Sequence, residues 1–367
     1  MKKISSILVL TILISSLHPM GVQGAEPPTL SVAQATTRAI NNSAAIRNLE
    51  DTISLTREGE QRIRDVFWAS PFFSTADFVS MQSTLMRQEA ARAVSQESIT
   101  VQRATLEFLV ANHFSNIIMA QNELKLFDEN LAIMEQDLNI LQVMVSLGMA
   151  SASQYNLMAS GVDQARHSRA QLQTTIDTAF RELNRLMGTS QTNIYNLIFE
   201  IEFNPLEEIN LARYIANHTR DNVGILNARN QLSIAQFELN NHTGRFDPIT
   251  GEVLPDTVTR GEREIFVNQA RRDLNDTIQN VENAVADIYT QIRQIELAIE
   301  ATTIEMAILL LELSVLEVQY YIGHITRLDI DKAYADINRL EEQQRRQKVN
   351  HSLLVMQLVN SNIAIGF

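Results

Sequence analysis

Two very long segments without proline dominate this sequence of 367 residues. After residue 28, proline occurs only at Pro71, Pro205, Pro248 and Pro255. Inside the intervening segments, apolar residues recur at alternating spacings of three and four residues, a pattern typical of long helices packed along a seam. Because such helices do not fit a compact globule, the pattern predicts an elongated protein.

The segment before Gly148 carries two apolar rows. The first is a heptad seam from Leu106 to Val145, interrupted at His113. The second repeats every seven residues, about 100° further round the same helix. Its members are Met119, Leu126, Ile133, Ile140 and Leu147. A helix with two apolar seams needs two neighbours, so the pattern favours a bundle or a closed wall of helices.

A comparable seam runs from Leu274 to Tyr320 and predicts a helix over about residues 262–321, roughly 90 Å long. The helix that follows it begins with apolar residues at the seam positions, but polar residues then replace them. These polar residues predict a stretch that is more accessible to water. They are Gln344, Gln347 and His351.

The two seams coincide at an offset of 175 residues, which places Leu106 on Val281 and Gly148 on Gly323. This register predicts an internal duplication, each copy running medium helix, break, long helix, glycine turn, medium helix. The predicted divisions are a signal segment at 1–24, a first repeat at 25–190 with its tip near 148, a linker at 191–208, and a second repeat at 209–367 with its tip near 323.

The composition excludes several classes of function. The chain has no cysteine, which excludes a disulfide scaffold, thiol catalysis and Cys-ligated zinc. A formal net charge of −13 disfavours nucleic-acid binding. The histidines are scattered, and no nucleotide-binding or nucleophile motif occurs. We therefore expect no enzymatic activity, no cofactor and no metal site.

The first 24 residues are typical of an export signal. Lys2 and Lys3 form a basic start, Ile7–Leu17 is apolar, and small residues precede Ala25. The apolar stretch is shorter than the ~20 residues that span a membrane. We expect cleavage and an envelope location, in the outer membrane or periplasm, with a retained anchor as the alternative.

Four short motifs, in order behind this signal, resemble the TolC-like outer-membrane efflux family. Two are glycine turns, and two mark the start and close of the first repeat. The motifs are Leu147-Gly148-Met149-Ala150-Ser151, Ile322-Gly323-His324-Ile325-Thr326-Arg327-Leu328-Asp329, Asn41-Asn42-Ser43 after Ala39-Ile40 (similar to Ala-Leu-x-Asn-x-Pro, with Ser43 where proline is usual), and Leu183 to Gly188 (similar to Leu-x-x-Leu-x-Gly).

The resemblance implies an all-α protomer of long antiparallel coiled-coil helices, three of which form a hollow α-barrel. It also implies a periplasmic adaptor and an inner-membrane transporter as partners. A membrane strand needs ~9–11 residues. Residues 71–82 hardly hold two, and residues 241–264 are polar and contain two prolines. We therefore expect the β-barrel strands of the family to be short or absent.

Five aromatic residues gather near the first of these stretches: Phe67, Trp68, Phe72, Phe73 and Phe78. They form either an interfacial membrane belt or a plug that packs the end of the helical barrel.

In the family that these motifs resemble, the glycine turns are tips that contact the adaptor. The implied contact residues are Leu147, Gly148, Met149, Ser151, Ile322, Gly323, Ile325 and Thr326. The alternative is a plain helix C-cap, since glycine adopts positive φ without steric cost.

The resemblance also implies a gate. Asp329 lies where the family has an acid at the narrowest opening, and Tyr320 matches a tyrosine that latches neighbouring tip helices. The alternatives are a helix N-terminal acid that complements the dipole, and a tyrosine that merely ends the seam.

The function predicted on these grounds is a passive efflux or secretion duct that conducts substrates handed over by the adaptor and the pump. The competing hypothesis is a non-conducting envelope scaffold or spacer derived from the same fold.

Overall fold

The computed structural model describes residues 27–69, 75–199, 203–242, 245–246, 253–254 and 258–364. The predicted signal segment, Phe72, Phe73 and the side chain of Trp68 lie outside the described part of the chain.

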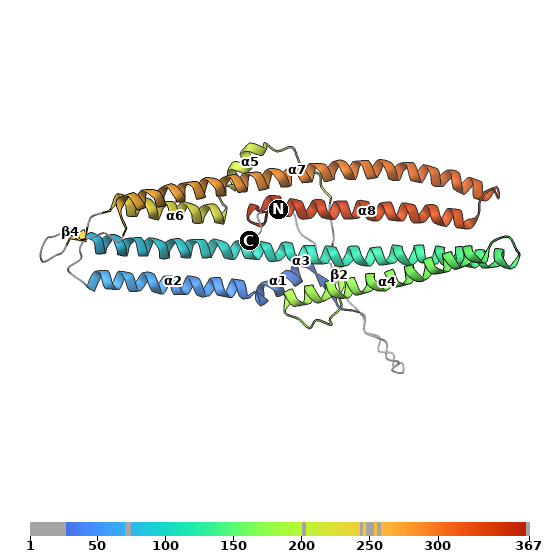
Figure 1. Cartoon of the computed structure of the whole chain (residues 1–367), viewed down its shortest axis with the longest axis horizontal. Coiled ribbons are helices and arrows are strands. Elements are labelled where there is room, and N and C mark those ends of the chain that lie inside the picture. The colour runs from blue at the N-terminus through green and yellow to red at the C-terminus, as the bar shows by residue number, and fades with distance from the viewer. Residues whose placement is uncertain are drawn as a thin grey trace, which may run out of the picture.

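Long helices make up most of the described chain (Figure 1). The first half contains α1 (Val32–Asn42), α2 (Ala44–Ala69), α3 (Thr75–Ser146) and α4 (Ala152–Met187). The second half contains α5 (Leu211–His218), α6 (Val223–Asn240), α7 (Arg260–Tyr321), α8 (Arg327–Val359) and the short α9 (Ser361–Ala364). With 72 residues in α3 and 62 in α7, each long helix spans roughly 90–110 Å. The predicted all-α, elongated fold is confirmed.

Strands are few and short within the described residues. β1 (Thr29–Ser31) pairs in parallel with β2 (Asn196–Ile198), so the chain before α1 is tied to the segment between the two halves. β3 (Arg245–Phe246) pairs antiparallel with β4 (Val253–Leu254). Among the helices described, none combines the length and the apolar character needed to cross a membrane.

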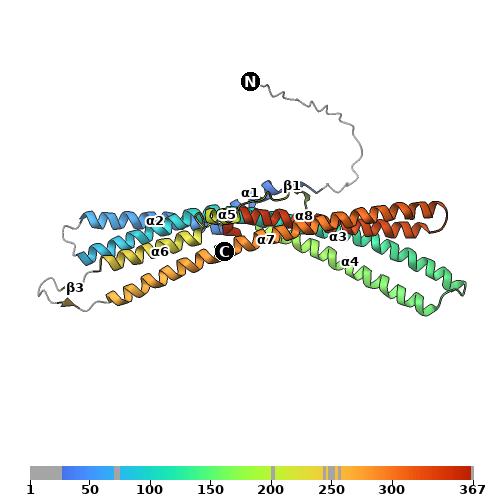
Figure 2. The same ribbon diagram turned by 90° about the horizontal axis from the view of Figure 1, so that it is seen from above.

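The helices are arranged as one layer rather than around a central core (Figures 1 and 2). In one half of the molecule α3 packs between α2 and α6, and α6 packs on α7. In the half that holds the glycine turns, which we call the tip half, α3 packs between α4 and α8, and α8 packs on α7. The order across the layer is therefore α2 or α4, then α3, then α6 or α8, then α7. As the two apolar rows predict, α3 has a neighbour on each side.

Each half of the chain has its own apolar core near the middle of the layer. The first contains Leu106, Val110, Ile117 and Leu183. The second contains the residues 175 positions later, which are Val281, Val285, Ile292 and Leu358. This correspondence supports the predicted duplication. His113, which interrupts the first seam, is half-buried, and burial lowers the pKa of His113 and favours the neutral imidazole at pH 7.

Candidate functional site

Both long helices of the tip half end in glycine turns of the same geometry, at the same end of the molecule (Figure 1). Gly148 has φ of 72° and Gly323 has φ of 78°, in the left-handed region. The amide after each glycine donates to the carbonyl five residues earlier, at 2.8 Å in both turns. A Cβ added at either glycine would meet nothing within 4 Å. Glycine is therefore needed for its backbone conformation and not because space is lacking.

Each turn leads directly into a capped helix. Ser151 Oγ accepts from the Gln154 amide at 3.2 Å, and Gln154 Oε1 accepts from the Ser151 amide at 2.9 Å. Thr326 and Asp329 form the same reciprocal pair at 3.4 and 2.8 Å. These capping boxes satisfy amides that the helix itself leaves unpaired. Both tips are thus the same rigid unit, a glycine followed after three residues by a capping hydroxyl.

The capping box accounts for the position of Asp329. Hydrogen bonds from the Thr326 hydroxyl and amide, with a smaller contribution from Lys332, lower the pKa of Asp329. The carboxylate is ionised at neutral pH and lies in the first turn of α8, where it complements the helix dipole. A role for Asp329 at the constriction of an assembly remains a prediction, as does a latch at Tyr320, which is 43% exposed.

The tips present apolar side chains to solvent. Leu147 is 67% exposed, Met149 69% and Ile322 55%. Ser151 and Thr326 are also exposed, whereas Ile325 is half-buried. A cap that only terminates a helix does not need such neighbours, and the contact role of the tips stays a prediction.

A second apolar seam, not identified in the sequence, continues from the tip along α7. Its members follow heptad spacing, and each is at least half exposed. This exposed α7 seam consists of Leu297, Ile304, Ile308, Leu311, Val315, Val318 and Ile322. The buried seam of α7 has the same period, and only the packing shows which of the two rows meets α6 and α8. Exposed apolar rows of this length are typical of protein contact surfaces.

In the tip half, α3 meets α8 through a line of polar pairs with separations of 2.8 to 3.1 Å. The pairs are Lys332–Asp137, Asn338–Glu129, Glu342–Asn122 and Arg346–Glu123. Burial raises the pKa of Glu342 although two arginines lie near it. The exposed Arg346–Glu123 pair contributes ~0–1 kcal/mol, whereas Glu342 of the Glu342–Asn122 pair is buried.

A buried polar cluster holds the segment between the two halves against α7 and α8. Glu296 accepts from the Leu206 amide at 2.6 Å, from Arg293 at 2.8 Å and from His351 at 3.1 Å. The Phe203 ring stands edge-on to the imidazole, with ring centroids 4.9 Å apart. His351 is only 2% exposed, so the predicted wetter stretch is wrong at this residue. Its polarity is satisfied by Glu296 rather than by water.

The motifs at the start and close of the first repeat meet in the structure. Asn42 Nδ2 donates to the carbonyls of Leu186 and Arg185, at 3.2 and 3.4 Å. Gly188 has φ of 68°, and a Cβ there would overlap the Asn42 amide. Ser43 has φ of −65°, a value that proline also adopts, but its amide donates to Ile40 O. Serine therefore adds a hydrogen bond that the usual proline could not make.

Two of the five clustered aromatics lie within the described side chains. Phe67 is half-buried and Phe78 is 41% exposed, with ring centroids 6.2 Å apart. Their contact supports local packing for this pair, and the membrane belt remains a prediction.

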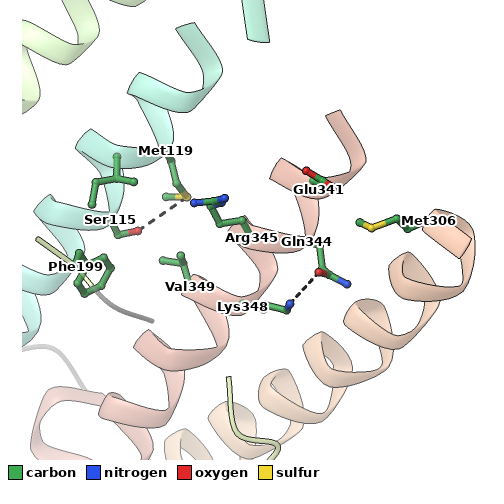
Figure 3. A pocket seen from close by; sticks show the side chains of 10 residues that line it. Ser115, Met119, Phe199, Met306, Glu341, Gln344, Arg345, Lys348 and Val349 are labelled. Carbon is green, nitrogen blue, oxygen red and sulfur yellow. Dashed lines mark hydrogen bonds between the residues drawn. The ribbon is translucent and has the colours of Figure 1, made fainter. Parts of the chain in front are cut away.

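A cavity of about 400 Å³ lies between α3, α7 and α8, beside Phe199 (Figure 3). Met119 and Met306 line it. Lys348, which also lines it, donates from Nζ to Gln344 Oε1 at 2.8 Å. Across the described ranges, no group of three or more His, Asp or Glu side chains is placed to bind a metal ion.

No protein-family model and no curated protein matches the sequence. Solved structures do match. The outer membrane protein VceC of Vibrio cholerae has a TM-score of 0.64 at 12% identity, over 89% of this chain and 95% of its own. The outer membrane channel CmeC of Campylobacter jejuni has a TM-score of 0.61 at 10% identity, over 92% of this chain and 86% of its own. CusC has a TM-score of 0.59 at 15% identity, over 91% of this chain and 95% of its own. Its crystal structures concern conformational changes that accompany folding and transmembrane channel formation.

Identities this low establish a common fold and not a common activity. Each match covers about nine-tenths of this chain and therefore extends over both halves. The chain described here therefore has the all-α fold of the TolC-like outer-membrane efflux channels.

Proposed function

We propose that this chain is the subunit of a passive, trimeric, TolC-like duct in the cell envelope. The exposed α7 seam carries the proposal, because it lies on one edge of a single helical layer. The opposite edge is formed by α2 and α4. Contact between unlike edges of successive copies generates a ring when the rotation between copies closes, and the family resemblance implies three copies.

The energy for transport through such a ring would come from another protein. The sequence contains no nucleotide-binding motif, so an inner-membrane transporter would supply the energy and a periplasmic adaptor would connect it to the duct. The outer-membrane channels that share this fold support a location in the outer membrane or the adjoining periplasm. Opening would require the α3–α8 polar line to part when the adaptor engages the tips.

Images of the purified assembly test the duct directly. Negative-stain averages are expected to show a three-fold particle with a central channel along the long axis. A solid rod or a monomeric bundle would contradict the duct and support the scaffold hypothesis.

The tips are the proposed adaptor contacts, and Gly148→Val combined with Gly323→Val tests them. Valine has space at both positions but is strained at positive φ, by ~1–2 kcal/mol at each site. Adaptor-dependent efflux is expected to be lost while the assembly stays intact by size-exclusion chromatography. Gly161→Ala, inside α4, is the control, because a Cβ there would lie 3.9 Å from its nearest neighbour, Met134 Cε. Unchanged efflux in the double variant would count against docking at the tips.

Asp329→Asn separates the proposed gate charge from the capping role. Asparagine keeps an oxygen for the Thr326 amide but loses the charge that the helix dipole favours, so only a small loss of stability is expected. A trimer would lose three negative charges at its opening, which should lower the preference for cations measured as a reversal potential in lipid bilayers. Asp336→Asn, also on α8, is the control. Equal selectivity in both variants would exclude Asp329 from the constriction.

A further inference from the structure

The layer of helices is interrupted at two places near its middle. There α2 and α4 follow one another end to end, as do α6 and α8, while α3 and α7 pass through without a break (Figure 1). Any motion of the tips reaches the other half of the molecule through α3 and α7 and across these two junctions. At each junction, apolar packing is accompanied by hydrogen bonds made by the side chain of an asparagine.

At the first junction Asn42 is a donor. Its Nδ2 reaches the carbonyls of Arg185 and Leu186, in the last turn of α4. The Arg185 carbonyl also accepts from the Gly188 amide at 3.3 Å. The Arg47 guanidinium, on α2, donates to the carbonyls of Asn41 and Asn42 at 3.0 and 3.1 Å. Asn42 thus contacts the end of α4 through its side chain and Arg47 of α2 through its backbone carbonyl.

At the second junction Asn362 is an acceptor. Its Oδ1 accepts from the Val223 amide, the first of α6, at 2.9 Å. Asn362 is 7% exposed and Val223 is 3% exposed, so water does not replace this bond readily. The backbone N–H of Asn362 donates to Asn360 Oδ1 at 3.1 Å, which ties Asn362 to the residue that caps α8.

We propose that Asn42 and Asn362 are positioning residues that couple the two halves of the helical layer by joining α4 to α2 and α8 to α6. This coupling is a property of the folded subunit and goes beyond the proposed conduction. The two residues use opposite ends of the same amide group. The proposal therefore makes opposite predictions for the same substitution at the two sites.

Asparagine-to-aspartate substitutions provide the test. Aspartate at position 42 has no amide donor and places a negative charge at the C-terminal end of α4, where the dipole opposes it. Aspartate at position 362 still accepts from the Val223 amide, at the N-terminal end of α6, where a negative charge is favoured. Asn42→Asp should therefore break the first coupling, and Asn362→Asp should keep the second.

Spin labels can report each junction separately, because the chain has no cysteine of its own. One pair of labels replaces Glu58 on α2 and Gln171 on α4, and the other replaces Ser233 on α6 and Gln343 on α8; all four residues are exposed. Distances are measured by double electron–electron resonance on the full-length protein, diluted with unlabelled subunits, and helix content is checked by circular dichroism.

Asn42→Asp and Asn42→Ala are expected to broaden the α2–α4 distance distribution and to leave the α6–α8 distribution unchanged. Asn362→Ala is expected to broaden only the α6–α8 distribution, which Asn362→Asp leaves as narrow as in the parent. Asn41→Ala is the control, because only the backbone of Asn41 takes part. An unchanged α2–α4 distribution in Asn42→Asp, or equal broadening by both substitutions at position 362, would overturn the proposal. Neither outcome depends on whether the assembly conducts.

Discussion

Glu296→Ala is expected to lower the free energy of unfolding by about 3–5 kcal/mol at neutral pH. The carboxylate is the common acceptor for the Leu206 amide, Arg293 and His351. Removing it leaves a fully buried imidazole and a backbone amide without their partner. Arg293 is 35% exposed and regains water, which places the effect toward the lower end of this range.

Chemical denaturation followed by circular dichroism measures this effect. Glu300→Ala, one turn further along α7 and exposed, is the matched control and should change stability by less than about 0.5 kcal/mol. Equal losses in the two variants would show that the cluster does not hold the connecting segment.

The same cluster predicts a pH dependence with a definite sign. Burial by itself raises the pKa of Glu296, but bonds from the Leu206 amide, Arg293 and His351 outweigh it, so the pKa lies below its ordinary value of 4.5. A carboxyl group whose pKa is lowered by folding stabilises the protein above 4.5, and this contribution is lost as the pH falls toward the folded-state pKa. The stability difference between the parent and Glu296→Gln should therefore shrink below pH 4.5. A constant difference would contradict the assignment.

Leu311→Glu is expected to dissociate the assembly into folded monomers. Leu311 is 69% exposed at the centre of the exposed α7 seam, where the proposed neighbouring copy would cover it. Losing a buried leucine and introducing an unpaired charge costs at least about 3 kcal/mol for each interface, or two orders of magnitude in the dissociation constant.

Analytical ultracentrifugation across a concentration series measures this shift, and circular dichroism confirms that the monomer stays helical. Gln291→Glu adds the same charge on α7 and is the control. It lies 20 residues away, which at 100° per residue is nearly the opposite face of the helix. If both variants assemble as the parent does, the seam is not the contact between copies.

The sequence by itself determined the elements whose causes are local. The seam from Leu274 to Tyr320 predicted a helix at about 262–321, and α7 spans Arg260–Tyr321. Gly148 and Gly323 marked the turns correctly, because a reversal at positive φ favours glycine whatever surrounds it. The motifs also predicted the fold that solved structures share with this chain.

Only the tertiary structure decided which apolar row of α7 is buried, because both rows have the same period and differ only in what packs against them. It also brought Asn42 to the end of α4, and His351 to Glu296 inside a stretch whose polarity had predicted water. Hydrogen bonds between residues 55 to 144 positions apart leave no periodic trace in a sequence. They depend on the geometry of helix ends, which exists only once the layer has formed.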